Sequence, residues 1–332
     1  MSLVPNSSQT GFRLLIIGNS RIARKRILPA LSASGRVLSI DMASRHSTRT
    51  ATQKLNLSGK IFNSYEKALA ESQADLVYIS LVNSAHATWA KQALNSGRHV
   101  IIDKPAVTEY SDAVGLVDLA KQNNRALFEA TVFQYHPQIK AIAEEFTKRH
   151  LIPTRISALF SFPPLEAGDF RYQSEYGGGA LHDLGPYAIH AGTVFFEEQP
   201  QKIFCHVNSR ASSGIETSFT ITALYSMGRS MVGHFGFDTE YQNTINVLGA
   251  ELCVQGERIF TIPADHENQF VIRHNNVTQT RTIPPSDCFL NFFNRVFDAC
   301  AHRDYDAWYE HFLADARSLD MLKKSAQKEM DP

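Results

Sequence analysis

The sequence lacks a surplus of charge of either sign, because 33 Lys and Arg residues balance 33 Asp and Glu residues. A protein that binds nucleic acid or an anionic membrane mainly through charge needs a basic excess, so neither is the expected partner. The first apolar run, Leu14 to Ile17, is too short for a secretory signal and has no basic cluster before it. We therefore expect a soluble, cytoplasmic protein whose partner is a small molecule.

Cysteine and histidine patterns typical of metal sites are also missing. The four cysteines are far apart, with no C-x-x-C spacing, and no H-x-x-x-H pair falls on a convincing helix. We expect neither a metal site nor a disulfide among Cys205, Cys253, Cys288 and Cys300. The chain has no internal repeat or low-complexity segment. Its 332 residues exceed what one core usually organises, which favours two domains.

The first part of the chain alternates between apolar runs and amphipathic stretches. Leu14 to Ile17 ends at Gly18, and apolar residues then follow one helical stripe from Ile22 to Leu31. Further strands are expected at 37–42, 76–81, 99–102 and 126–128, with helices at 86–95 and 111–122, the second opened by a Ser111 cap. This alternation predicts a parallel sheet with right-handed crossovers.

The period of the pattern changes after about residue 153. Apolar and polar residues alternate over 219–225, and shorter strand-like runs follow at 231–237, 244–248, 252–254, 259–262 and 270–272. Helices are expected at 289–300 and 308–324. The pattern predicts an open, mainly antiparallel sheet with few helices to cover it, and such a sheet needs burial. We therefore expect a homodimer or homotetramer.

The turn after the first strand resembles a dinucleotide-binding fingerprint. Gly18, Asn19, Ser20, Arg21, Ile22 and Ala23 occupy the place of G-x-G-x-x-G/A between a strand and a helix. Gly18 permits the tight turn, and the helix N-terminus can face a pyrophosphate. Ser20 stands where the middle glycine is usual. The alternative is an ordinary turn between strand and helix.

The end of the second strand indicates which dinucleotide is preferred. NAD-binding sites carry an acidic residue there for the ribose 2′-hydroxyl, whereas this sequence has Ser44 and Arg45. A serine leaves room for a 2′-phosphate, and a guanidinium can bind it bidentately. Asp41 lies earlier in the strand and is less well placed. NADP is therefore expected over NAD, unless these polar residues only form a solvated loop.

Two later stretches carry candidate chemistry. Lys104 follows the strand at 99–102, at the sheet edge where ligands of parallel sheets bind, although a lysine is more often simply exposed. After the run Gly177-Gly178-Gly179, an expected helix carries Asp183, Tyr187 and His190 on one face. The alternative there is a polar face turned to water. Pro186 lies inside this helix and should bend it.

Taken together, these stretches resemble the Gfo/Idh/MocA oxidoreductase family over essentially the whole chain. The matching segments include I-I-G-N-S-R-I-A, Y-I-S-L-V-N-S-A-H, H-V-I-I-D-K-P, F-E-A-T-V-F-Q-Y-H-P-Q and F-R-Y-Q-S-E-Y-G-G-G-A-L-H-D-L-G-P-Y. The resemblance implies a Rossmann domain followed by an open antiparallel sheet domain, and catalytic roles for Lys104, Asp183 and Tyr187. It also implies cofactor contacts from Leu81, Asn83, His86 and Lys104, and substrate contacts from Lys104, Gln134, Arg171, Asp183, Tyr187 and His190.

The sequence departs from the family pattern at several positions. Besides Ser20, Asp103 replaces the glutamate of the E-K-P motif, and Gln134 stands where an arginine is frequent. The tyrosine at 187, with the stretches F-E-A and H-F-G-F-D-T-E-Y-Q-N-T-I-N-V-L-G, makes the chain look more like the branch that includes sugar-nucleotide 3-ketoreductases than like inositol dehydrogenases. The resemblance therefore implies an NADP(H)-dependent reductase of a nucleotide-linked keto-hexose. A dehydrogenase of a free sugar, polyol or dihydrodiol and a non-catalytic regulatory protein that binds the cofactor are the alternatives.

The resemblance also sets the expected domains and roles. A dinucleotide-binding domain is expected over 1–128, and a domain for substrate binding and oligomerisation over 129–332. Reduction of a ketone needs a proton donor, and Tyr187 and Lys104 are the two candidates. We expect the Lys104 ammonium to lower the pKa of Tyr187 and favour it as the donor. Asp183 would then orient Lys104 or a sugar hydroxyl, and Lys104 as the donor stays open.

Overall fold

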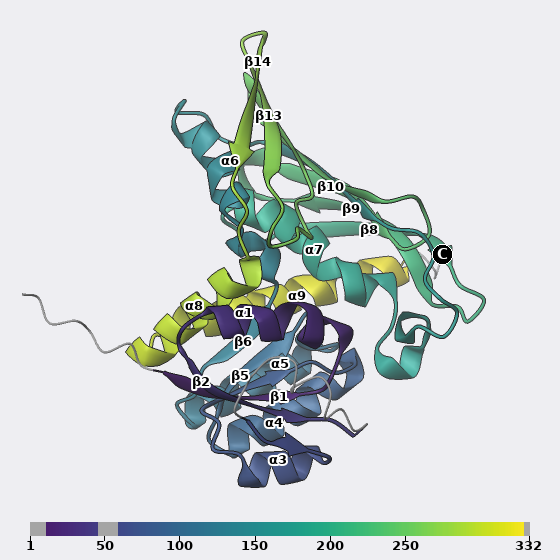
Figure 1. The fold of residues 1–332 in the computed structure, drawn as a ribbon. Helices are drawn as coiled ribbons and strands as arrows, with labels where there is room; N and C mark the ends of the chain where they lie inside the picture. Colours follow the sequence, from purple (N-terminus) through teal and green to yellow (C-terminus); the bar gives the residue numbers. More distant parts are fainter. Residues whose placement is uncertain (1–10, 46–58, 329–332) are drawn as a thin grey trace, which may run out of the picture.

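The computed structural model describes residues 11–45 and 59–328, which form two β-sheets with helices between and around them (Figure 1). A six-stranded sheet is built from the first part of the chain, and an eight-stranded sheet from the second. The predicted fold class is confirmed, since a parallel α/β domain precedes a domain with a large, mainly antiparallel sheet.

All strand pairs of the first sheet are parallel, in the order β3-β2-β1-β4-β5-β6. The near-continuous apolar sequence of the central strands suits a sheet that helices cover on both faces. The strands are β1 (Phe12–Ile17), β2 (Val37–Ala43), β3 (Ile61–Phe62), β4 (Leu76–Ile79), β5 (His99–Asp103) and β6 (Leu127–Ala130). Ile17 pairs with Ile79, and Ile79 with Ile102, so β1, β4 and β5 end side by side.

Helical segments connect these strands, and the predicted helix 86–95 is confirmed with its boundaries. Gly97, at φ +76°, ends it, as the Ser96-Gly97 pair indicated. Ser111, however, is not a cap, because its helix begins one residue earlier and Glu109 occupies the cap position. The segments are η1 (Ala23–Ile27), α1 (Leu28–Ala33), α3 (Tyr65–Glu71), η2 (Asn83–Ala85), α4 (His86–Asn95) and α5 (Tyr110–Gln122).

The second sheet has the order β14-β13-β12-β11-β7-β10-β9-β8. Strand β7 lies in its middle and pairs in parallel with β10, while the other strand pairs that the described residues form in this sheet are antiparallel. The strands are β7 (Arg155–Ser161), β8 (Lys202–Arg210), β9 (Glu216–Leu224), β10 (Ser230–Gly236), β11 (Gln242–Leu248), β12 (Leu252–Glu257), β13 (Asn268–His274) and β14 (Val277–Ile283).

Two features of this domain differ from the sequence prediction. The apolar run 259–262 is not a strand but part of the loop that follows β12. Its side chains Ile259, Phe260 and Ile262 are nevertheless buried, which explains why the run is apolar. Strands β7, β8 and β14 were not predicted. In β14 five of seven residues are exposed, so its sequence carries almost no apolar alternation, and only its pairing with β13 makes it a strand.

Helices cover one face of the second sheet. Helix α7 contacts β9, β10 and β7, helix α9 contacts β8, and α6 contacts β12. The opposite face carries large apolar side chains in the open: Phe204 is 48% exposed, Val232 45% and Leu159 41%. Phe204 and Val232 lie in one row across the sheet, since each is paired with Thr222. The remaining segments are η3 (Val132–Tyr135), α6 (Pro137–Thr147), η4 (Phe170–Tyr172), η5 (Ser174–Tyr176), α7 (Ala180–Phe196), η6 (Ser226–Gly228), α8 (Cys288–His302) and α9 (Asp306–Lys328).

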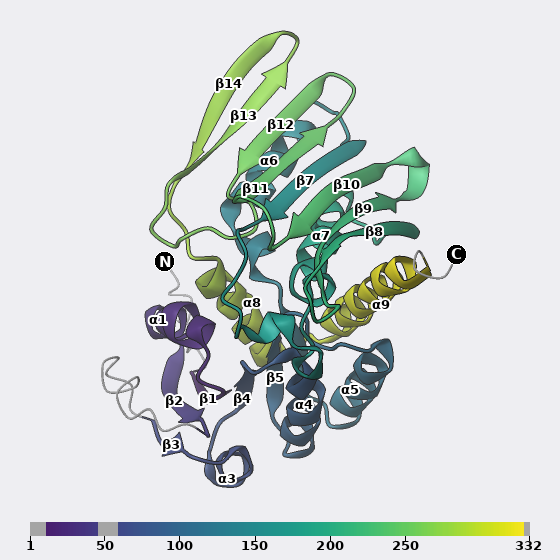
Figure 2. The same ribbon diagram turned by 90° about the vertical axis from the view of Figure 1, so that its right-hand side faces the viewer.

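The last two helices lie between the two sheets in both views (Figures 1 and 2). Although they follow the second sheet in sequence, most of their buried side chains belong to the core of the first domain: Phe289, Phe292, Phe293, Phe297, Tyr309 and Phe312. The end of α9 instead enters the second core with Leu319 and Leu322. Neither α9 nor any other helix in the described ranges has the length and apolar character to cross a membrane.

Candidate active site

The turn after β1 requires glycine. Gly18 has φ +108°, and a Cβ atom there would lie 2.1 Å from the carbonyl oxygen of Ser80 in the adjacent β4 turn. The strand end, the turn and the helix therefore pack as the fingerprint needs. Asn19 and Ser20 are partly exposed at the turn, while Arg21 and Ile22 are exposed at the start of the helix. This arrangement fits a dinucleotide pyrophosphate at the helix N-terminus.

Ser20, which replaces the middle glycine, has a definite structural role. Its hydroxyl accepts a hydrogen bond from the Ala23 N–H at 2.9 Å and lies 2.7 Å from the Ser80 hydroxyl. Ser80 in turn donates to Asp103 Oδ2, and the Tyr78 hydroxyl donates to Asp103 Oδ1, both at 2.5 Å. A chain of hydrogen bonds therefore joins the turn to the residue before Lys104. The two unusual residues of the motifs, Ser20 and Asp103, belong to one network.

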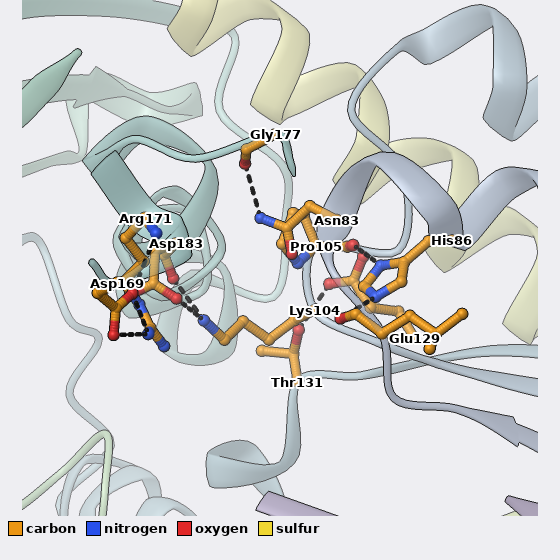
Figure 3. A network of polar contacts seen from close by, with 11 residues as sticks. Asn83, His86, Lys104, Pro105, Glu129, Thr131, Asp169, Arg171, Gly177 and Asp183 are labelled. Atoms are coloured by element: carbon orange, nitrogen blue, oxygen red, sulfur yellow. Dashed lines mark hydrogen bonds and ion pairs between the residues drawn. The ribbon is translucent and has the colours of Figure 1, made fainter. Parts of the chain in front are cut away.

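Lys104 and Asp183 come from different domains and meet in a buried ion pair (Figure 3). Lys104 Nζ donates to Asp183 Oδ1 at 2.7 Å and to the Asp183 backbone carbonyl at 2.6 Å. The other carboxylate oxygen of Asp183 accepts from Arg171 Nε at 2.7 Å. Arg171 also pairs with Asp169, 3.2 Å away. The Gly-rich run before α7 places Asp183 in the first turn of the helix.

Lys104, Asp183, Arg171 and Asp169 form a network of charges, the Lys104 network, whose members stabilise one another. Burial alone would raise the pKa of Asp183, but the Lys104 and Arg171 cations outweigh it and hold this pKa well below its ordinary value. Burial lowers the pKa of Lys104, yet Asp183 more than compensates and the pKa ends above its ordinary value. Lys104 is therefore a cation and Asp183 an anion at neutral pH.

Tyr187 lies one helical turn beyond Asp183, with the Lys104 ammonium 4.9 Å from its ring centroid. The ring packs among Phe133, Phe160 and Phe260. Lys104 lowers the pKa of Tyr187 as predicted, but the expected net decrease is wrong. Burial raises this pKa, Lys104 lowers it and Asp183 raises it again, so it ends above its ordinary value. The Tyr187 hydroxyl is therefore protonated at neutral pH.

Three predicted cofactor residues surround the end of β4. Asn83 is buried, and its amide donates to the carbonyl of Gly177 at 2.8 Å, which joins the two domains. His86 is fully buried, with its ring nitrogens 2.8 Å from the Pro105 carbonyl and 3.1 Å from the Leu81 carbonyl. Burial lowers the pKa of His86. The imidazole therefore fixes the backbone at Pro105, directly after Lys104. Leu81, the third of these residues, is partly exposed.

Gln134 and His190 are not part of the Lys104 network. The Gln134 amide donates to the Thr131 carbonyl at 3.1 Å. His190 is buried on α7, and its Nε2 lies 3.1 Å from Asp315 Oδ2 on α9. Although Asp183, Tyr187 and His190 share the helix, only the first two meet Lys104.

The predicted 2′-phosphate residues lie at the end of β2. The Arg45 guanidinium is exposed and lies over the Tyr65 ring, 4.8 Å from its centroid. Ser44 is buried, and its backbone N–H donates to the Phe62 carbonyl at 2.9 Å. Asp41, the acidic residue within the same strand, is engaged elsewhere. Its carboxylate accepts from the Lys60 N–H at 2.7 Å and from the Ser72 hydroxyl at 2.6 Å.

Sequence reasoning missed the polar residues that support these groups. Ser80 follows a strand of the parallel sheet, and that position was a usable signal. Asp169 lies in an irregular segment, where nothing in the sequence indicated that it would pair with Arg171. Glu129 and Asp315 come from segments 186 positions apart, and only the fold brings both to His190.

Comparison with known families covers both domains. The profile described as "Oxidoreductase family, NAD-binding Rossmann fold" of Gfo/Idh/MocA matches residues 12–131. The profile described as "GFO/IDH/MocA C-terminal domain" matches residues 153–255. Together these matches span more than half of the chain.

Individual relatives are similar over nearly their whole length. A dTDP-3,4-didehydro-2,6-dideoxy-alpha-D-glucose 3-reductase from Actinomadura kijaniata is 27% identical over 317 residues, covering 95% of this chain and 96% of the relative. A D-xylose 1-dehydrogenase (NADP(+)) from Haloferax volcanii is 25% identical over 317 residues, covering 94% and 96%.

A solved structure shows the same arrangement of domains. The crystal structure of a 3-ketoreductase from Actinomadura kijaniata in complex with NADP and TDP-benzene superposes with a TM-score of 0.88 at 26% identity, covering 96% of this chain and 98% of that one. With both domain profiles matched in order and the Lys104–Asp183 pair formed between the domains, the chain belongs to the Gfo/Idh/MocA family of oxidoreductases.

Proposed function

We propose that the protein reduces a keto group on a nucleotide-linked hexose, with NADPH as the hydride source. The observation that carries this proposal is the meeting of Lys104, Asp183 and Tyr187 at the carboxyl end of the parallel sheet. Relatives named as reductases of a dTDP-linked sugar favour the nucleotide-linked substrate. The NADP complex of a similar 3-ketoreductase favours the cofactor.

Each of the three residues has a distinct role in this proposal. Hydride addition to a ketone develops negative charge on its oxygen, so a cation and a proton donor are needed there. Lys104 supplies the cation, because Asp183 keeps it protonated and fixes its position. Tyr187 supplies the proton to the new hydroxyl group. Arg171 and Asp169 hold Asp183 in place, and Lys104 as the proton donor is the competing assignment.

A dehydrogenase of a free sugar or diol is the second candidate. Similarity to a D-xylose 1-dehydrogenase and to a trans-1,2-dihydrobenzene-1,2-diol dehydrogenase favours it. A purely regulatory role has no such support, because the cation, its carboxylate partner and the tyrosine are all in place.

A substrate panel separates the two candidates. The purified protein is mixed with NADPH and a dTDP-linked 3-keto-hexose, and the loss of absorbance of the reduced cofactor is followed. Free D-xylose and a dihydrodiol are tested with NADP⁺ in parallel. The proposal expects turnover with the nucleotide-linked ketone at a kcat/KM well above that for either free compound. Turnover only with a free sugar or diol would favour the second candidate.

The proposal for NADP rests on Arg45 and Ser44. A guanidinium can form charge-assisted hydrogen bonds with the 2′-phosphate, and losing them costs about 1.5 kcal/mol or more. We therefore expect Arg45→Ala to weaken NADPH binding about tenfold and to leave NADH binding unchanged. Fluorescence titration with both reduced cofactors measures this.

A conservative variant controls for charge alone. Arg45→Lys keeps the positive charge but loses the planar fork, so its NADPH affinity should fall between those of the wild type and Arg45→Ala. Wild-type binding that favours NADH, or an NADPH affinity untouched in Arg45→Ala, would contradict the assignment of the 2′-phosphate to Arg45.

We also propose a homodimer or homotetramer, because the second sheet leaves Phe204, Val232 and Leu159 exposed on its uncovered face. Light scattering should give at least twice the mass of the chain at micromolar concentration. Val232→Glu places a charge at the centre of this surface and should shift the protein towards a monomer. Ile152→Glu, at an exposed apolar residue outside the strands, should not. A wild-type monomer would rule this interface out.

A further inference from the structure

Three titratable side chains from three different elements meet in a second cluster, apart from the Lys104–Asp183 pair. They are Glu129 on β6, His190 on α7 and Asp315 on α9. One polar atom from each lies within 4.8 Å of the other two. His190 is only 5% exposed, and its Nε2 lies 3.1 Å from Asp315 Oδ2. The strand of the first domain, the helix of the active site and the last helix therefore converge on one imidazole.

The remaining partners of the two carboxylates are neutral. Glu129 accepts from the Thr131 hydroxyl at 2.6 Å and from the Ala106 N–H at 2.9 Å. Asp315 accepts from the Gln199 amide at 3.0 Å. Within residues 11–45 and 59–328, neither carboxylate forms an ion pair with a lysine or arginine. Glu129 and Asp315 are both partly buried, and two adjacent negative charges without a cation are unfavourable there, so the site favours a proton or an ion.

We propose that His190 is a positioning residue, protonated at neutral pH, whose imidazolium holds the active-site helix between Glu129 and Asp315. Tyr187 and Asp183 lie one and two turns earlier on this helix, so a shift of His190 would move both. This consequence for turnover rests on the proposed reductase function. The protonation state of His190 does not.

The surroundings of His190 favour the charged form. Burial lowers the pKa of the imidazole, but Asp315 and then Glu129 outweigh burial and raise it above its ordinary value of 6.5. Burial and Asp315 also raise the pKa of Glu129, so both groups tend to keep a proton in the cluster. The Phe133 ring also faces the imidazole, with its centroid 6.3 Å away, and it carries no charge.

The raised pKa makes the stabilising effect of His190 depend on pH with a defined sign. The imidazolium contributes its full stability below the pKa of the unfolded chain, near 6.5, and loses it as the pH rises through the higher pKa of the folded state. The Tm difference between the wild type and His190→Asn should therefore be largest near pH 6 and shrink towards pH 9.

His136 offers a matched control with the opposite behaviour. It is also buried, and burial lowers its pKa to about 4. Its contribution is fully present above pH 6.5, so the Tm difference between the wild type and His136→Asn should stay constant from pH 7 to 9. Both variants remove one buried imidazole from the full-length protein, and only the charged one should show the decline.

Two direct measurements complete the test. In NMR spectra of histidine-labelled protein, the ring resonance missing from His190→Asn should titrate with a midpoint above pH 7. Turnover of that variant should fall on the order of ten- to a hundredfold, from misplacement of the helix, with NADPH affinity nearly unchanged. A His190 resonance that titrates with a midpoint below pH 7, or a Tm difference that is flat with pH, would overturn the proposal. Elemental analysis that finds one equivalent of a divalent metal, lost in Glu129→Gln, would overturn it as well, because the cluster would then be a metal site.

Discussion

Replacing Lys104 with methionine is expected to lower kcat on the order of 10³-fold while leaving NADPH affinity within a few-fold of the wild type. Methionine keeps the length and apolar stem of lysine and removes only the ammonium group. Without it, the developing negative charge on the substrate oxygen has no cation beside it. Asp183 keeps Arg171 as a partner at 2.7 Å, so its carboxylate does not become an isolated buried charge. Steady-state kinetics and cofactor titration measure the two effects.

Lys323 provides a closely matched control for this substitution. Its Nζ also contacts one backbone carbonyl, that of Thr108, and one carboxylate, that of Glu109. Its side chain is 16% exposed, against 18% for Lys104. Its partner Glu109 is 63% exposed, against 10% for Asp183, so Lys323→Met should cost less stability than Lys104→Met and almost no turnover. A Lys104→Met enzyme with near-normal kcat, or a Lys323→Met enzyme as inactive as Lys104→Met, would show that the ammonium of Lys104 has no specific part in the reaction.

Tyr187→Phe is expected to lower kcat by roughly 10² to 10⁴, the range for loss of a general acid. The ring stays packed among the same phenylalanines, so only the hydroxyl is lost. Because the pKa of Tyr187 lies above its ordinary value of 10.0, ionisation of the wild-type donor should not reduce the rate until the pH exceeds 10. Kinetics at saturating NADPH, followed from pH 7 to 10, measure both expectations.

Tyr225→Phe serves as the control for removing a buried tyrosine hydroxyl. Tyr225 packs against Phe196 at the far end of the same helix α7, so the variant tests helix packing without touching the Lys104 network. It should keep nearly normal turnover. If Tyr187→Phe also keeps it while Lys104→Met abolishes turnover, Lys104 is the proton donor. If neither Tyr187→Phe nor Lys104→Met matters, the site lies elsewhere.

The first domain could be predicted because its pattern is local. Apolar runs such as Leu14 to Ile17 end at a turn, and each strand is followed by an amphipathic helix, so neighbouring residues define each element. The second sheet was less predictable. The run at 259–262 is as apolar as a strand, but it lies in a loop and buries its side chains from there. Strand β14 has almost no apolar pattern and is a strand only because it pairs with β13. Periodicity alone cannot distinguish these cases.

For the candidate site, position along the chain indicated Lys104, Asp183 and Tyr187, because strand ends and helix faces can be read from spacing. The helix face was an incomplete guide, however, since His190 shares it and is buried against Asp315 instead. The pKa of Tyr187 could not be inferred either. Its direction depends on burial and on Asp183 as well as on Lys104, and only the fold shows how these effects balance.

The return of α8 and α9 to the first core has a consequence for how the protein is made. Residues such as Phe292 and Phe297 are fully buried in that core, yet more than 150 residues separate them from the last strand of its sheet. Domains generally fold as units during synthesis, starting from the N-terminus. Here the first domain cannot complete its core until α8 and α9 have left the ribosome. Until then, the sheet exposes the apolar surface that these two helices cover. Chaperone demand during translation should therefore fall on the N-terminal half of the chain.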